Sequence, residues 1–223
     1  MKIMENENPN KVKGGKTNTE LYVQLGIIAV LVIVIAFNAG KVYNSGTGLV
    51  TIGSVSASEI IPKGVPAVYG KELGVSYDDV SPNNLQLADI TINKLTQYEN
   101  KELTKEQMER YIKIGSSISC EYCCGAKAII FSNGERACGC AHSYAMRGLA
   151  KYLLIEHPDM TDEEILSELG KWKVLFFPEI HEQKAQVLKS QGIDPGNYIN
   201  LASNLYRGIE KGQTSSGGMV GGC

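Results

Sequence analysis

The apolar residues of this chain follow two patterns, one uninterrupted run near the start and helical stripes along the second half. Residues 21–40 contain no charged side chain. At 1.5 Å per residue, a helix of that length spans about 30 Å, the thickness of a bilayer core. The run therefore predicts a transmembrane helix over residues 21–40.

Lysines are distributed unevenly around this run. Residues 1–20 form a polar stretch with four lysines, which is typical of a disordered tail, whereas Lys41 is the one lysine among the 20 residues that follow the run. The positive-inside rule then places the N-terminus in the cytoplasm and the C-terminal domain outside. The sequence predicts a single-pass protein of the cell membrane, with the membrane as its one assigned partner.

Three regions are expected after the run. Ser, Gly and Thr are frequent from residue 41, a composition typical of a flexible linker, so residues 41–80 are interpreted as a tether. Residues 81–212 should form one extracytoplasmic domain. Residues 213–223 are a Gly-rich tail that ends in Cys223.

Helical periodicity dominates the predicted domain. Apolar side chains recur every three or four residues, most clearly from 141 to 157, and a further stripe covers 197–209. Helix-start signals, which are capping side chains or a proline at the first position, occur at Ser81, Thr104, Thr161 and Pro178. The fold class is therefore predicted to be mainly α.

Composition narrows the possible functions. The chain has 223 residues, of which 43% are apolar, enough to bury one sizeable core. Its 22 basic and 24 acidic residues give a net charge of −2, and no basic stripe with interleaved aromatics points to nucleic acid. No phosphate-binding loop, Ser/His/Asp order or paired carboxylates stand out, so no catalytic residue is predicted.

The strongest chemical signal is a cysteine cluster. Five of the six cysteines lie between residues 120 and 142, in the order Cys-x2-Cys-Cys, a gap, and then Cys-x-Cys-x-His. Thiolate and imidazole groups in two short clusters are ligands for Zn²⁺, Cu(I) or an iron–sulfur centre. The predicted ligands are Cys120, Cys123, Cys138 and Cys140, with His142 as the substitute, and the predicted accessory thiols are Cys124 and Cys223.

The gap between the two halves of the cluster suggests a small β-hairpin. Residues 128–131 form a short apolar strand, Asn133-Gly134 supplies a turn, and residues 136–138 can pair back. A hairpin from Ile129 to Cys138 would bring the two ligand pairs to one metal ion.

This layout resembles the treble-clef zinc fingers, over residues 120–142 and the helix that follows. In that family the first ligand pair lies in a knuckle that ends in glycine, which Cys124-Gly125 matches, while Cys120 and Cys123 match the spacing. The second pair lies on the first helical turn, but Cys138-x-Cys140 is one residue shorter than the family pattern. The resemblance implies a structural zinc site.

The sequence allows more than one metal, more than one state of the cysteines and more than one class of protein. Zinc is the expected metal, with Cu(I) as an alternative that a thioether from Met146 would favour, and an iron–sulfur cluster ranks below both. The cysteines could also form disulfides or act as redox thiols. Gly15 followed by Glu20 resembles the processing site of pilin-like proteins, which would make the chain an interaction subunit. The leading interpretation is a membrane-anchored extracytoplasmic metal-binding protein.

Overall fold

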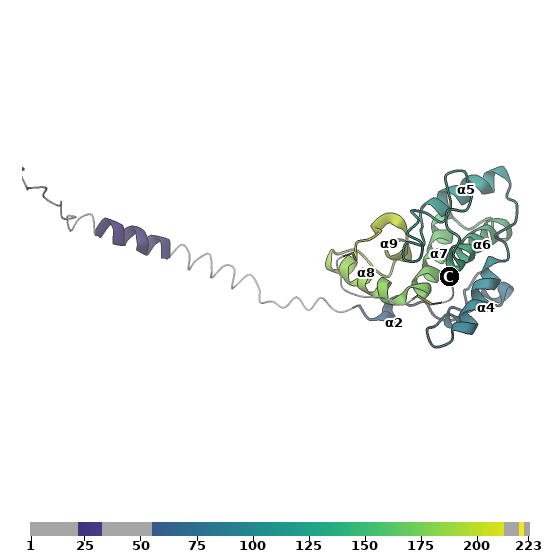
Figure 1. Ribbon diagram of the computed structural model, residues 1–223, viewed down its shortest axis with the longest axis horizontal. Coiled ribbons are helices and arrows are strands. Elements are labelled where there is room, and N and C mark those ends of the chain that lie inside the picture. The colour runs from purple at the N-terminus through teal and green to yellow at the C-terminus, as the bar shows by residue number, and fades with distance from the viewer. Residues whose placement is uncertain (1–21, 33–54, 212–218, 221–223) are drawn as a thin grey trace, which may run out of the picture. The chain divides into compact units, whose positions relative to one another are not determined.

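The computed structural model describes residues 22–32, 55–211 and 219–220 (Figure 1). The chain divides into two units, Met1–Thr51 and Ile52–Cys223. The predictions for the first 20 residues, for residues 41–54 of the tether and for Cys223 lie outside the described residues.

The first unit corrects the membrane prediction. Residues 22–32, the described residues of this unit, are helical. None of the helices in the described residues has the length and apolar character needed to cross a membrane. The transmembrane helix over residues 21–40 is contradicted by this finding, and with it the single-pass orientation, the cell-membrane localisation and the membrane as partner. Residues 33–40 lie outside the described residues.

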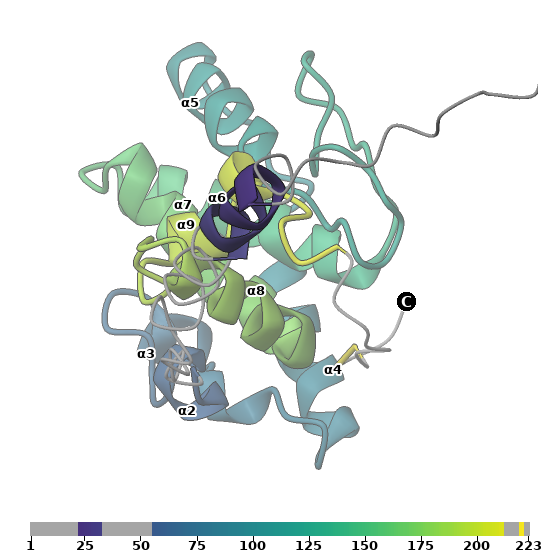
Figure 2. The same cartoon turned by 90° about the vertical axis from the view of Figure 1, so that its left-hand side faces the viewer.

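The second unit consists of helices and connecting loops, and its mainly α character was predicted. Figure 1 shows α6 and α7 in the middle of this unit, with α4 and α5 toward one side and α8 and α9 toward the other. The view in Figure 2 again shows α5 at an edge. The elements are α2 (Ala57–Ile60), α3 (Gly70–Leu73), η1 (Tyr77–Asp79), α4 (Leu85–Thr96), α5 (Lys105–Ser116), α6 (Ala141–Glu156), α7 (Asp162–Phe176), α8 (Pro178–Ser190), α9 (Tyr198–Ala202) and η2 (Asn204–Tyr206).

Local capping explains where the long helices begin. Thr104 and Thr161 each cap a helix through the backbone N–H at the third position, and the Gln or Glu there bonds back to the cap. Pro178 is the first residue of α8, where its missing N–H has no intrahelical partner to lose. These three predicted starts are confirmed.

Two helix boundaries differ from the prediction. The Ser81 hydroxyl accepts a hydrogen bond from Asn83 N in a turn, and α4 begins later, with the side chain of Asn84 accepting from Leu87 N. The helix expected over 197–209 ends at Ala202, because Ser203 is extended and caps η2 instead. Apolar periodicity continued through this break and concealed it.

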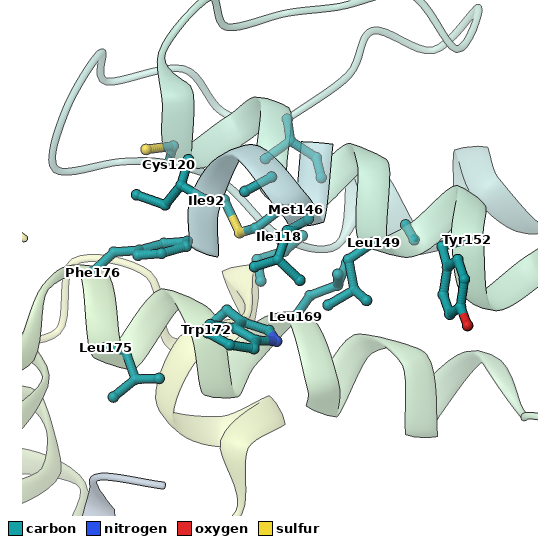
Figure 3. Packing of buried hydrophobic residues seen from close by; sticks show 14 of the residues in the cluster. Ile92, Ile118, Cys120, Met146, Leu149, Tyr152, Leu169, Trp172, Leu175 and Phe176 are labelled. Atoms are coloured by element: carbon teal, nitrogen blue, oxygen red, sulfur yellow. The ribbon is translucent and has the colours of Figure 1, made fainter. Parts of the chain in front are cut away.

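The main core lies between α6 and α7. Figure 3 shows Met146 and Leu149 from α6 facing Leu169, Trp172 and Phe176 from α7. All five side chains are buried. Burying a large apolar side chain contributes about 1.5–3 kcal/mol, so this contact anchors the helix that carries the second half of the cysteine cluster.

Residues 55–80 contribute to the folded unit, although they were predicted to belong to the tether. Val55 and Ile60 are buried against α7, α8 and α9, and Tyr69 and Tyr77 are buried in the main core. The hydroxyl groups of Tyr69 and Tyr77 both donate to Glu168 Oε2, and Trp172 Nε1 donates to the Tyr69 oxygen. These contacts fix the segment on α7.

The predicted β-hairpin is wrong. Within the described residues there are no strands, and one isolated antiparallel bridge joins Ile130 and Arg136. The turn is present, with Gly134 N donating to Phe131 O at 2.9 Å. The pairing stops after the bridge because the chain diverges at Cys138, whose sulfur is bonded to Cys124 and whose carbonyl accepts from Arg147.

Candidate metal and thiol site

The site is organised at the N-terminus of α6. Cys140 is the N-cap residue, and Ser143 N donates to its sulfur at 3.4 Å. A sulfur in this position receives the amide dipoles of the first helical turn, which stabilise negative charge. The helix start that the sequence predicted therefore holds a thiol in an environment that favours thiolate.

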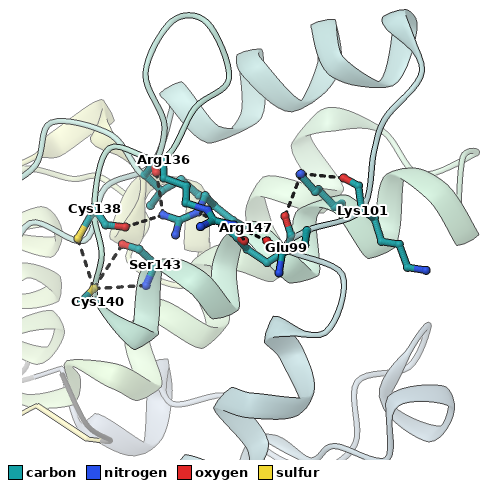
Figure 4. Close-up of polar contacts among 10 residues, drawn as sticks. Glu99, Lys101, Arg136, Cys138, Cys140, Ser143 and Arg147 are labelled. Carbon is teal, nitrogen blue, oxygen red and sulfur yellow. Dashed lines mark hydrogen bonds and ion pairs between the residues drawn. The ribbon is translucent and has the colours of Figure 1, made fainter.

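Cys140 lies between two other sulfur atoms. Its Sγ is 3.3 Å from Cys120 Sγ and 3.4 Å from Cys138 Sγ. Figure 4 shows the second of these contacts, together with the Ser143 contacts to the same sulfur. Cys120, which comes from the loop after α5, is completely buried, and Cys138 and Cys140 are nearly so. Three sulfurs from two separate segments thus meet in the protein interior.

The five described cysteines are in different oxidation states. Cys124 and Cys138 form a disulfide, whereas Cys120 and Cys140 are free thiols. Cys123 is also disulfide-bonded, to none of the other four described cysteines. The disulfide interpretation therefore accounts for part of the cluster, and the thiol interpretation accounts for the rest.

The two free thiols differ in acidity. The hydrogen bond with Cys120 lowers the pKa of Cys140 against the effect of burial, and hydrogen bonds with His142 and Ser143 lower it further. The interaction with Cys140 raises the pKa of Cys120 far above its usual range, and burial adds to this shift. Cys140 is therefore the more acidic thiol of the pair.

His142 points its ring into the same space. Its Nε2 is 2.8 Å from the carbonyl oxygen of Val220, and its ring packs against Phe176 and Phe177. Because a carbonyl can only accept, Nε2 is the donor in this contact, and Nδ1 is the nitrogen left for the cysteine side. Nδ1 is buried, and the His142 side chain also forms a hydrogen bond with Cys140.

The structure brings four of the predicted site residues together. Donor atoms of Cys120, Cys123, Cys140 and His142 all lie within 4.8 Å of one another. A second group within the same distance consists of Cys124, Cys138 and Cys140, so Cys140 belongs to both. These groups are close enough to hold a metal ion. Cys138, expected in the first group, lies in the second.

A buried ionic network positions the second group. Arg147 donates to Glu99 Oε1 at 2.8 Å and to the carbonyl oxygens of Cys138 and Ile129 (Figure 4). Glu99 Oε2 accepts from Arg136 at 2.6 Å. Glu99 could not be recognised from the sequence, because a single acid in the loop after α4 carries no local signal.

A second ionic network, also missed from the sequence, lies next to Cys120. Glu121 Oε1 is 3.2 Å from Lys173 Nζ, and Glu121 Oε2 is 3.1 Å from Arg207 Nε. Burial lowers the pKa of Lys173 to about 8, although Glu121 opposes that shift. The sequence shows that Lys173 lies on the apolar face of a helix. It does not show that Glu121, from a distant loop, is its partner.

The remaining histidines lie away from the site. His157 caps the C-terminus of α6, and its Nε2 is 2.9 Å from Glu72 Oε2. His181 is fully buried, with Nδ1 bonded to the Phe177 carbonyl. Burial and the nearby Lys173 hold the pKa of His181 well below its ordinary value.

Comparison with protein-family models, curated proteins and solved structures gives no match for this chain. The fold and the site therefore define it only as a helical protein with a buried cysteine–histidine cluster. The chemistry of the site follows from the cysteine and histidine side chains that it brings together.

Proposed function

We propose that this chain is a metal-binding protein whose buried site, once reduced, holds one zinc ion through Cys120, Cys123, Cys140 and His142. The observation that carries the proposal is the position of His142. A nitrogen of its buried ring lies together with the sulfur atoms of Cys120, Cys123 and Cys140, and all four donor atoms are within 4.8 Å of one another, close enough to hold one ion.

The surroundings of His142 support the same conclusion. Histidines that bind metals usually donate their other ring N–H to a backbone carbonyl or a carboxylate, which fixes the tautomer. Val220 supplies that carbonyl, and it is held in turn by its own N–H, which donates to Phe176 O at 2.8 Å. The hydrogen bond from Nε2 to the Val220 carbonyl thus orients the ring so that Nδ1 is on the side of the sulfur atoms.

The ligand set favours zinc. Three thiolates and one imidazole are a common set for structural zinc, which takes four N and S ligands and leaves no open position. Soft sulfur ligands also suit Cu(I), which is the alternative. Cys120 and His142 are fully buried and Cys140 is 8% exposed, so little room remains for a substrate at the metal. A structural or stored ion fits better than a catalytic one.

Reduction is part of the proposal because Cys123 is in a disulfide. Its thiolate becomes a ligand only after that bond is reduced, whereas Cys120 and Cys140 already have free sulfurs. Zinc affinity should therefore be higher for the reduced protein than for the oxidised one. Metal binding that deprotonates thiols also releases protons, which gives a second readout.

The test is zinc binding by the full chain with and without a phosphine reductant, measured by calorimetry and by metal analysis after gel filtration. The reduced wild type should retain one equivalent of zinc. His142→Ala should weaken binding by at least about tenfold, and Cys140→Ser should do the same. Cobalt should replace zinc and give a thiolate charge-transfer band.

His157→Ala is the matched control, since His157 lies at the other end of the same helix and outside the cluster. It should bind zinc like the wild type. Equal zinc retention by wild type and His142→Ala, with both proteins folded by circular dichroism, would refute the assigned ligand set. Tighter and stoichiometric binding of Cu(I) than of zinc would identify copper as the metal.

A further inference from the structure

Cys140 links a disulfide to a free thiol. On one side its sulfur is 3.4 Å from Cys138 Sγ, which is bonded to Cys124. On the other side it is 3.3 Å from the sulfur of Cys120. The four sulfurs thus form a continuous chain in the order 124, 138, 140, 120, from an exposed residue to a completely buried one.

We propose that this chain of sulfurs is a disulfide relay, in which Cys140 moves the disulfide from the exposed Cys124–Cys138 pair to the buried Cys120–Cys140 pair. The activity is thiol–disulfide exchange, and its outside substrates are thiols and disulfides that reach Cys124. The function proposed above does not include this activity.

The first step is an attack within the second cysteine group. Cys140 gives up its proton to solvent and its sulfur attacks Cys138 Sγ. The bond between Cys138 and Cys124 breaks, and Cys124 leaves as a thiolate that takes up a proton from solvent. The intermediate has a disulfide between Cys138 and Cys140. Sulfur–sulfur contact at 3.4 Å already places the reacting atoms at the separation expected of near-attack conformers, about 3–3.5 Å.

The second step moves the bond inward. The Cys120 thiol gives up its proton to solvent, and the Cys120 thiolate then attacks Cys140 Sγ. The bond between Cys140 and Cys138 breaks, and Cys138 leaves as a thiolate that takes up a proton from solvent. The products are a Cys120–Cys140 disulfide and two thiols at Cys124 and Cys138. No electrons are gained or lost overall, so no added oxidant or reductant is required.

The relay has a consequence for the metal site, which rests on the zinc site proposed above. Cys120 and Cys140 are ligands in that site, and a disulfide between them removes two of the four. Oxidation at the exposed Cys124–Cys138 pair would then displace the ion from the interior. Conversely, zinc bound to Cys140 would block the first step, because the attacking sulfur is occupied.

The experiment traps Cys124 as it is released. The oxidised full chain is incubated without reductant with a bulky maleimide, which reaches exposed thiols only. The products are digested and mapped by mass spectrometry under non-reducing conditions. In the wild type, Cys124 should become labelled with time and a Cys120–Cys140 disulfide should form in equal amount.

Two variants separate the steps. Cys140→Ser removes the attacking sulfur, so Cys124 should stay unlabelled and paired with Cys138. Cys120→Ser permits only the first step, so labelled Cys124 should accumulate together with a Cys138–Cys140 disulfide. Cys124 labelling at the same rate in wild type and Cys140→Ser, or no labelling in either, would refute the relay.

The two proposals are tested in different redox states of the chain. Zinc retention is therefore measured on the phosphine-reduced chain, and Cys124 release is measured on the oxidised chain. Zinc retention by the reduced chain, without any release of Cys124 from the oxidised chain, would leave the metal site standing and overturn the relay. Release of Cys124 from the oxidised chain, with no zinc retained by the reduced chain, would overturn the metal site and leave the relay standing.

Discussion

Arg147 donates a hydrogen bond from Nη1 to the carbonyl oxygen of Cys138 at 2.8 Å, and both residues are buried. The same guanidinium is paired with Glu99, whose side chain is 3% exposed. A residue in the middle of α6 thereby holds the loop that carries the disulfide. The helix and the cysteine loop are joined by a charge-assisted network as well as by apolar packing.

Arg147→Lys should destabilise the protein by about 3 kcal/mol or more. A lysine cannot donate to Glu99 and to two carbonyls at once, so the variant leaves buried polar groups unsatisfied. Urea unfolding monitored by circular dichroism measures the loss. Arg136→Lys is the control, because Arg136 pairs with the same Glu99 from a side chain that is 49% exposed, and it should lose less than about 1 kcal/mol. Equal losses would show that the buried position is unimportant.

Gly148→Ala should destabilise the contact between α4 and α6. A Cβ atom at Gly148 would lie 2.2 Å from the carbonyl oxygen of Leu95 and 2.9 Å from Thr96 Cα, so the helices would have to separate. We expect a loss of about 3 kcal/mol in the free energy of unfolding. Gly139→Ala is the control, since a Cβ there meets open space, and it should change stability by less than about 1 kcal/mol. A Gly148→Ala variant as stable as the control would contradict this packing.

The sequence was informative where a structure depends on neighbours along the chain. The Thr161 cap with Glu164, the proline at the start of α8 and the apolar stripe of α6 each involve residues within a few positions, and each prediction was confirmed. Spacing also placed Cys120, Cys123 and Cys140 in the predicted set, with His142 as the substitute ligand, although the β-hairpin expected to bring the two clusters together is absent from the described residues.

The sequence did not predict the features that depend on contacts between distant segments of the chain. Spacing alone did not separate Cys138 from the first ligand group, because that choice depends on Arg147 and on the disulfide to Cys124. The carbonyl of Val220 behind His142 has no signature in any sequence. The charge-free run of residues 21–40 satisfied the composition of a membrane span, but no helix in the described part of the chain has the length and apolar character to be one.

Asp162→Asn should lower stability at neutral pH and have little effect in acid. Asp162 accepts from Arg110 Nε and Lys113 Nζ, both at 2.8 Å, and so ties α5 to the start of α7. Burial raises the pKa of Asp162, but these two hydrogen bonds outweigh it and hold the pKa below its ordinary value. A lowered folded-state pKa gives stability that is present above the unfolded value of about 3.9 and is lost as the pH falls below it.

The expected loss is about 2 kcal/mol near neutral pH, shrinking toward zero near the pH of acid unfolding. Unfolding curves for wild type and variant across this range provide the measurement. Glu163→Gln is the control that distinguishes the effect of the ion pair from that of the helix dipole. Glu163 is in the same first turn of α7 as Asp162, and it is exposed. This variant should lose less than about 1 kcal/mol. A loss for Asp162→Asn that does not depend on pH would rule out the ion pair as the cause.

Removing zinc from the reduced protein should loosen the cysteine loop before the helices. Zinc that binds the folded state a thousandfold above its dissociation constant adds about 4 kcal/mol to stability. That free energy acts mainly on residues 119–140, because apolar packing against α7 holds α6 in place without a metal. Hydrogen exchange should therefore show faster exchange in the loop after chelation, with the amides of α6 and α7 still protected.

Cys124→Ser tests which cysteine group is responsible. Cys124 is outside the first group, so this variant should keep zinc and show the same loss of loop protection on chelation as the reduced wild type. His142→Ala, which lacks a ligand, should show fast loop exchange with or without zinc. If chelation instead released α6 and α7 together with the loop, zinc would be required for the whole fold, and the apolar core between these helices would be insufficient on its own.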